Sequence, residues 1–106
     1  MDKKRKAFLS AKAKVLKALA HPTRLYMVEE LAGGEKCVCK LNENIDADFS
    51  TISKHLSVLK QAGIVRDEKR GKMVFYTLEV PCVLQFMGCI EETIKSRAEA
   101  QMNMLK

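Results

Sequence analysis

Apolar residues recur every three or four positions along most of the chain, and this period predicts a largely helical fold. The first predicted helix covers about 5–20, and lysines separate the residues of its apolar stripe, Phe8, Ala11, Val15 and Leu19. His-Pro-Thr at 21–23 interrupts it, because the residue before a proline is disfavoured in the helical conformation. Pro22 or Thr23 suits the start of a second helix, which the glycine pair at 33–34 ends.

A short segment from about 38 to 45 leads into the most clearly patterned helix, predicted over about 49–62. Asp48 is a good N-cap for it, and Gly63 stands where a C-terminal glycine belongs. Its apolar residues fall at helical spacing, at Ile52, Leu56 and Leu59. The other side carries hydroxyls, a lysine and an amide, which form a surface rich in hydrogen-bonding groups.

The period then changes from 3.6 to 2, and two β-rich runs flank a basic turn that contains glycine. This pattern predicts a hairpin over about 64–78. A final helix is predicted over about 81–104, with Pro81 in its first turn. The order of helices with a hairpin after the polar-faced helix predicts one domain over 1–106, mainly α with a small β-hairpin: a winged helix-turn-helix. In such a fold the second helix of the motif enters the major groove of DNA.

Candidate DNA contacts lie on that recognition helix and at the hairpin tip. Base edges are read by side chains with donors and acceptors near the start of the helix in the groove, here Ser50, Thr51, Ser53, Lys54 and His55. Arg70 and Lys72 in the hairpin turn are expected to bind phosphate. The net charge of +6, most of it before residue 25, agrees with a polyanionic partner, although a solvated lysine-rich face explains it equally well.

Dimerisation is predicted from size. A single helix reads few base pairs, and a domain of 106 residues covers too little DNA for tight specific binding alone. The helices at about 5–20 and 81–104 have apolar stripes that so small a core cannot absorb. We expect them to pair across a two-fold axis, placing the recognition helices about 34 Å apart.

Four cysteines occur in a chain without a secretory signal or an apolar run long enough to span a membrane, so we expect a cytoplasmic protein with no membrane partner. Thiols in a reducing compartment are more often metal ligands, redox sensors or buried apolar residues than structural disulfides. Cys37 and Cys39 can point to the same side and bind one soft ion, or can be two ordinary buried cysteines. A helix N-terminus and neighbouring lysines favour their thiolate forms.

Five segments carry a recognisable pattern: ALAHPTRL at 18–25, CVCKL at 37–41, STISKHL at 50–56, LKQAGIV at 59–65 and GKMVFYTL at 71–78. Together they resemble the arsenical-resistance (ArsR/SmtB) family of winged-helix repressors. The resemblance covers about 12–95 and implies a homodimeric repressor that leaves its operator DNA when an inducer binds. Phe49 departs from the family pattern, in which this position is often polar.

The resemblance also implies that Cys37 and Cys39 form an inducer site for arsenite or a cadmium-type ion. The family's usual third cysteine is absent, because Asn42 occupies its neighbourhood and residues 1–36 contain no cysteine. A three-sulfur site therefore needs Cys82 or Cys89, which lie about 10 Å apart along a helix and cannot both bind one ion. The family's zinc site requires histidine on the final helix, which has none, and His21 is expected to cap a helix instead.

Three other functions are weighed against this one. In a redox or persulfide switch, a disulfide from Cys37 or Cys39 to a final-helix cysteine would replace the metal. A winged helix used only for protein contacts would not bind DNA. An enzyme is not expected, since neither a nucleophile with a base nor a Cys-x-x-Cys pair is evident. No prosthetic group is expected; the small molecule is As(III) or another thiophilic metal ion.

Overall fold

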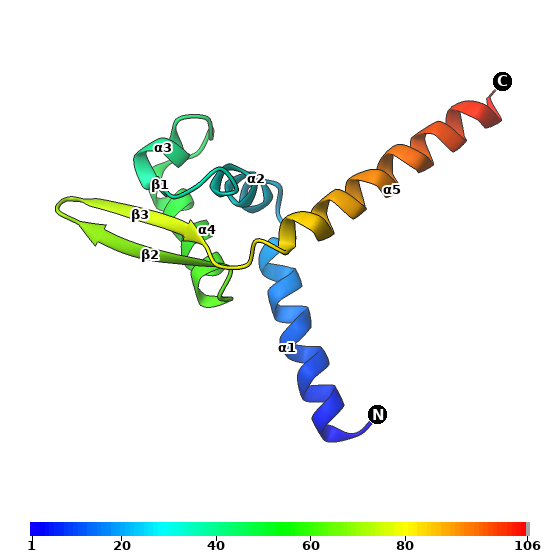
Figure 1. The fold of residues 1–106 in the computed structure, drawn as a ribbon, viewed down its shortest axis with the longest axis horizontal. Helices are drawn as coiled ribbons and strands as arrows, with labels where there is room; N and C mark the ends of the chain where they lie inside the picture. The colour runs from blue at the N-terminus through cyan, green and yellow to red at the C-terminus, as the bar shows by residue number, and fades with distance from the viewer. Residues whose placement is uncertain (106) are drawn as a thin grey trace.

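The structure is a computed structural model that describes residues 1–105, within which the chain forms five helices and three strands (Figure 1). The helices are α1 (Lys3–Leu19), α2 (Pro22–Leu31), α3 (Val38–Asn42), α4 (Phe49–Gln61) and α5 (Val83–Met104). The strands are β1 (Lys36–Cys37), β2 (Val65–Arg70) and β3 (Met73–Leu78). The predicted fold class, mainly helical with a small hairpin, is confirmed. No helix within 1–105 is long and apolar enough to cross a membrane.

The core forms where α2, α3 and α4 meet the end of α1 and the start of β2. The predicted stripe of α4 is buried, with Ile52, Leu56 and Leu59 at most 1% exposed. They pack with the side chains of the other elements, Ala18, Leu19, Met27, Val28, Leu31, Leu41, Ile64 and Val65. This apolar cluster fixes the orientation of α4, so the polar side of that helix faces outward.

Helix boundaries follow local capping chemistry. His21 caps α2 as predicted, because its Nδ1 accepts a hydrogen bond of 3.1 Å from the backbone N–H of Thr23. Gly63 follows α4 with φ of +79°, a left-handed conformation that a glycine adopts without strain. The start of the final helix differs from the prediction: Pro81 and Cys82 form a turn, and α5 begins at Val83.

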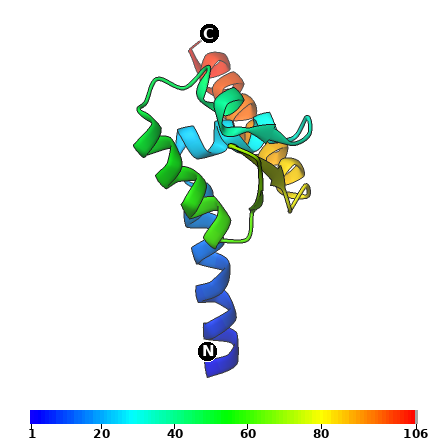
Figure 2. The same cartoon turned by 90° about the vertical axis from the view of Figure 1, so that its left-hand side faces the viewer.

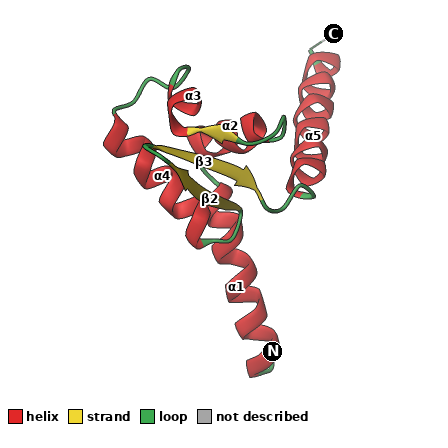
Figure 3. Ribbon diagram, turned by 60° about the vertical axis from the view of Figure 1, so that its left-hand side comes forward, coloured by secondary structure: helices red, strands yellow, loops and turns green. Residues whose placement is uncertain are grey.

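The sheet has one strand more than the predicted hairpin. β2 and β3 pair antiparallel, and β1 joins the other edge of β3, giving the order β1-β3-β2 (Figure 3). In this register Lys36 lies opposite Tyr76 and Cys37 lies opposite Phe75. A strand of two residues is too short for an alternating pattern, so the sequence did not predict β1. Its pairing joins the segment before α3 directly to the hairpin, which we call the wing.

The two terminal helices extend away from this body in different directions (Figures 1 and 2). The radius of gyration is 16.9 Å, against about 13 Å for a compact domain of 100 residues. Along the described helix α5 no side chain is buried, and only its first turns touch the core. Large apolar side chains remain exposed on both helices: Phe8, Leu9 and Leu16 on α1, and Phe86, Ile90, Ile94 and Met102 on α5.

Candidate nucleic-acid interface and cysteine pocket

The outward side of α4 begins at a well-formed helix cap. The carboxylate of Asp48 accepts a hydrogen bond of 2.8 Å from the backbone N–H of Thr51. Hydrogen bonds from the side chain and the backbone of Thr51 hold the pKa of Asp48 below its ordinary value. In the first turns of α4, Phe49 and four polar residues are exposed to solvent and line a shallow surface pocket. The polar residues are Ser50, Ser53, Lys54 and Ser57. Four of the five predicted base-reading residues, Ser50, Thr51, Ser53 and Lys54, are therefore exposed.

His55 is placed differently from its predicted role. Its ring is half-buried and lies 4.4 Å, between ring centroids, from the ring of His21. Its Nδ1 is 3.3 Å from Nη1 of Arg24. Burial lowers the pKa of His55, and the charges of His21 and Arg24 lower it further. His55 thus contacts residues at the junction of α1 and α2, unlike the four exposed residues predicted with it.

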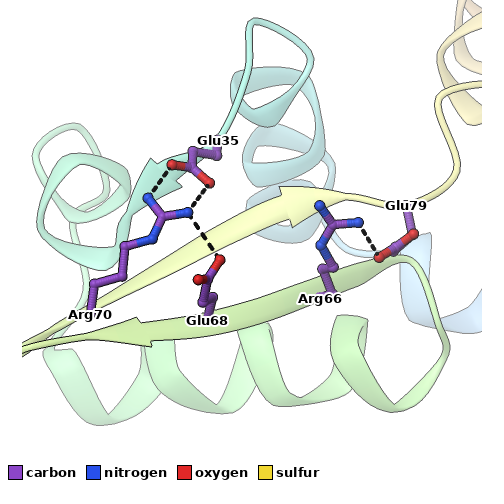
Figure 4. Close-up of polar contacts among 5 residues, drawn as sticks. All are labelled: Glu35, Arg66, Glu68, Arg70 and Glu79. Atoms are coloured by element: carbon purple, nitrogen blue, oxygen red, sulfur yellow. Dashed lines mark hydrogen bonds and ion pairs between the residues drawn. The ribbon is translucent and has the colours of Figure 1, made fainter.

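The two basic residues predicted at the wing tip also differ from each other. Lys72 follows Gly71 in the turn and is exposed. Arg70 instead forms ion pairs with the carboxylates of Glu35 and Glu68 (Figure 4). Its guanidinium carbon also lies 4.7 Å from the ring centroid of Phe75. The hydrogen bond from Arg70 is the main cause that lowers the pKa of Glu35. Arg70 therefore ties the residue before β1 to the wing.

A second ion pair lies further along the same hairpin. Arg66 of β2 contacts Glu79, just beyond β3, at 2.9 Å between Nη1 and Oε1 (Figure 4). Both side chains are substantially exposed, and such pairs contribute little to stability individually. Together with the strand pairing, the two networks keep β2, β3 and the segment before β1 in one arrangement.

The cysteine pair lies where β1 becomes α3. Cys37 is the last residue of β1 and the N-cap of α3, and it is 5% exposed, whereas Cys39 is exposed in the first turn. The two sulfur atoms form a disulfide. Beside them lies a pocket of about 300 Å³ that reaches Phe49 at the start of α4 and the wing residues Lys72, Met73 and Val74; Val38 and Asn42 complete its lining. The pair therefore borders both predicted DNA-contacting elements.

The final-helix cysteines are not part of this pocket. Cys82 precedes α5 and Cys89 lies within it, and both have exposed free thiols. Within residues 1–105 no three His, Cys, Asp or Glu side chains form a group that would hold a metal ion. The disulfide in the structure differs from the one predicted for the redox alternative, because it joins Cys37 to Cys39, while Cys82 and Cys89 are free.

Sequence reasoning missed the contacts made across the fold. Glu35 had no signal of its own, since its partner Arg70 is 35 positions away in the chain. Met73 was assigned only to a strand, and its place beside the cysteine pair depends on how the wing folds back. Phe49 was noticeable because it is a large apolar residue on an otherwise polar helix surface, and it is 65% exposed.

The order of elements and the exposed polar side of α4 define a winged helix-turn-helix transcriptional regulator. Residues 21–67 match the family profile described as bacterial regulatory protein, arsR family. An HTH-type transcriptional regulator of Methanocaldococcus jannaschii is 38% identical over 81 residues, 76% of this chain and 91% of that protein. The chain belongs to the ArsR family.

Two further relatives extend the comparison. An arsenic resistance transcriptional regulator of Pseudomonas putida is 43% identical over 70 residues; the match covers 63% of this chain but only 55% of the length of that regulator. The solution structure of a homodimeric winged helix-turn-helix domain of Mycobacterium bovis, a possible ArsR-family regulator, superposes with a TM-score of 0.78. It is 26% identical, and the superposition covers 94% of this chain and 93% of that one. Family and relatives are transcriptional regulators, not enzymes.

Proposed function

We propose that this protein is a homodimeric repressor that binds operator DNA through α4 and the wing and is released when a thiophilic species binds Cys37 and Cys39. The observation that carries the proposal is the pocket in which the cysteine pair borders both Phe49 of α4 and Lys72 of the wing. Binding at the pair would change the contacts of both elements at once. Arsenite is the first candidate ligand, followed by cadmium and other soft ions.

The DNA contacts proposed are Ser50, Thr51, Ser53 and Lys54 on α4 and Lys72 on the wing. All five side chains are exposed, and the buried stripe on the opposite side of α4 holds that helix in place. Lys54 and Lys72 supply charge for guanine or phosphate, and the hydroxyls hydrogen-bond to either. Arg70 contributes indirectly, since it is paired with Glu35 and Glu68 and keeps the wing in position.

The subunit interface proposed is formed by α1 and α5. Both helices extend from the body and carry large exposed apolar side chains, among them Phe86, which is 49% exposed, and Ile90, which is 46% exposed. Several large exposed apolar side chains on one helix are expected where that helix packs against another subunit. The relative of Mycobacterium bovis, which has the same fold and is homodimeric, supports the proposal of a homodimer.

Coupling between the inducer site and DNA follows from the strand pairing. Cys37 lies opposite Phe75 of β3, so we expect a shift of the Cys37 backbone to be passed to the wing. Cys37 is also the N-cap of α3, the first helix of the helix-turn-helix, and α3 leads into α4. For effective release the coupling free energy must be of order 1–3 kcal/mol, which is about 5- to 150-fold in DNA affinity.

The experiment measures binding of the reduced protein to a duplex selected from a random pool, by fluorescence anisotropy, with and without arsenite or cadmium. Arsenite or cadmium should weaken DNA binding by at least fivefold, the lower end of that range. The variant Cys37→Ser/Cys39→Ser should bind DNA normally and show no response. Lys54→Ala should weaken DNA binding itself. A normal response in the double variant would place the inducer site elsewhere, and failure to select any duplex would favour a protein-interaction module.

The disulfide between Cys37 and Cys39 favours a second candidate, a thiol-based redox sensor. Here a disulfide or polysulfide removes two electrons from the pair, and both thiol protons are released as the S–S bond forms. The same anisotropy assay separates the two candidates, because oxidant then releases DNA in the absence of any metal. The response should be reversed by a thiol reductant and should be absent in the double variant.

A further inference from the structure

Arg24 connects three helices at the junction of α1 and α2. Its Nε donates a hydrogen bond of 2.6 Å to the carbonyl oxygen of Ala18, and its Nη2 donates one of 3.4 Å to that of Lys17. Both carbonyls lie in the last turn of α1, where a helix leaves oxygens without their usual i+4 partners and a cation is favourable. The third nitrogen, Nη1, lies 3.3 Å from Nδ1 of His55 on α4. One side chain of α2 therefore joins a proposed dimer helix to the recognition helix.

The contact between Arg24 and His55 requires a neutral imidazole. A guanidinium carries only donors, so Nδ1 of His55 must accept, and the proton of the neutral ring is then on Nε2. A protonated ring is a donor at both nitrogens and would place an N–H and a positive charge against Arg24. The same holds for His21, whose Nδ1 accepts a hydrogen bond from the backbone N–H of Thr23. Both rings at this junction therefore act as acceptors, a role that protonation removes.

The charged groups around His55 do not favour a proton on its ring. Arg24 comes from α2, and His21, at 4.4 Å between ring centroids, comes from the segment before it. Lys14 and Lys17 of α1 line a surface pocket together with Arg24. Burial lowers the pKa of His55, and the charges of His21 and Arg24 lower it further. The surroundings of the ring therefore favour its neutral form.

Carboxylates do not compensate for these positive charges. Within residues 1–105, no carboxylate forms an ion pair or a hydrogen bond with Arg24 or with either histidine. Asp67 of β2 does reach α4, but there it pairs with Lys60. A proton on His55 would therefore add a charge to a junction that has only cations to oppose it.

We propose that Arg24 is a positioning residue for DNA binding: through neutral His55 it fixes the recognition helix α4 relative to α1, and the hold on DNA weakens when His55 gains a proton. This inference rests on the proposed DNA-binding function and adds an acid response that is independent of the cysteine pair. The step is the transfer of one proton from solvent to Nδ1 of His55, which breaks the hydrogen bond from Arg24 and no covalent bond.

The sign of the acid response separates this role from a direct DNA contact. A histidine that faced phosphate would gain a positive charge in acid, and DNA would then bind more tightly. His55 instead gains its charge beside Arg24, so DNA binding should weaken as the pH falls. The direction of the change alone therefore tells the two roles apart.

The test measures binding to a selected duplex by fluorescence anisotropy from about pH 8 to about pH 5, the range in which histidine changes charge, at constant salt and with the cysteines reduced. Wild-type affinity should fall about fivefold or more, the lower end of the range for coupled sites. His55→Asn keeps an acceptor near the position of Nδ1 but does not titrate. It should bind like wild type at the alkaline end and lose the acid response.

Two further variants locate the effect at Arg24 and His55. Arg24→Lys keeps the positive charge but loses the planar fork that reaches α1 and α4 together, so it should bind DNA more weakly at the alkaline end. His21→Asn is the matched control, because asparagine also caps a helix and does not titrate. It should bind DNA like wild type at the alkaline end and keep the fall in acid.

Each outcome separates this inference from the proposed function. Wild-type affinity that stays constant or rises in acid overturns the inference and leaves the DNA-binding function intact. A fall that persists in His55→Asn, or Arg24→Lys that binds as tightly as wild type, also overturns it. Circular dichroism over the same range detects unfolding, and a loss of helix content shared by wild type and His55→Asn counts against the inference. Failure of the wild type to select any duplex overturns the proposed function itself.

Discussion

Replacing Ile94 by glutamate tests whether α5 forms the subunit interface. Ile94 lies in the middle of the exposed apolar stripe of α5 and is 63% exposed. Complete burial of an isoleucine side chain contributes about 1.5–3 kcal/mol, so its exposed part leaves about 1–2 kcal/mol to be gained in a dimer. A two-fold interface contains the residue twice. The loss is therefore about 2–4 kcal/mol, which raises the dimer dissociation constant about 30- to 1,000-fold.

Sedimentation equilibrium over a range of protein concentrations measures this constant. Ser96→Glu, which adds the same charge to the same helix about 200° around its axis from Ile94, is the control and should leave the constant unchanged. Far-UV circular dichroism checks that both variants keep their helix content. A wild-type protein that is monomeric at micromolar concentration, or an Ile94→Glu variant that dimerises like wild type, would refute the reasoning.

Three further predictions concern DNA binding, the core and the wing. Lys54→Ala should reduce the slope of log affinity against log salt by about 0.9, the effect of one phosphate contact, while His55→Ala should leave the slope unchanged; anisotropy in a salt series decides. Leu56→Ala should lower the free energy of unfolding by about 2–5 kcal/mol in urea titrations, because Leu56 is 1% exposed in the core. Since Arg70 lowers the pKa of Glu35, Glu35→Gln should be less stable than wild type above about pH 4.3, the ordinary glutamate value, and this difference should disappear as the pH falls through the lower folded-state pKa. A difference that persists in acid would show that charge is not its cause.

The parts of the fold that local chemistry determines could be predicted from the sequence. Asp48 and Gly63 mark the start and the end of α4 through contacts within a few residues, and the helical spacing of Ile52, Leu56 and Leu59 marks its buried side. The wing likewise follows from a change of period around a turn that contains glycine. Such signals are complete within a window of about 15 residues, which is the range over which periodicity is informative.

The candidate site depended on contacts that no local window contains. His55 lies at the border between the buried and exposed sides of α4, so its direction is decided by Arg24 and His21, which come from another part of the chain. Arg70 is a residue type that commonly binds phosphate, but in the structure it forms ion pairs with Glu35 and Glu68. The cysteine motif was visible in the sequence, but no local pattern showed that Phe49, Met73 and Val74 lie in the same pocket.

The unequal exposure of the two cysteines imposes an order on any reaction at the pair. Cys39 is exposed in the structure while Cys37 is 5% exposed, and we expect the same order of exposure once the disulfide is reduced. An incoming electrophile is therefore captured by the outer sulfur first, and the inner one closes the ring afterwards. A reagent with a single leaving group, such as an alkylating agent, stops at Cys39 and never engages the residue attached to the wing. Only a compound with two replaceable groups can bind both sulfur atoms. The burial of Cys37 therefore favours ligands that can form two bonds to sulfur over those that form one.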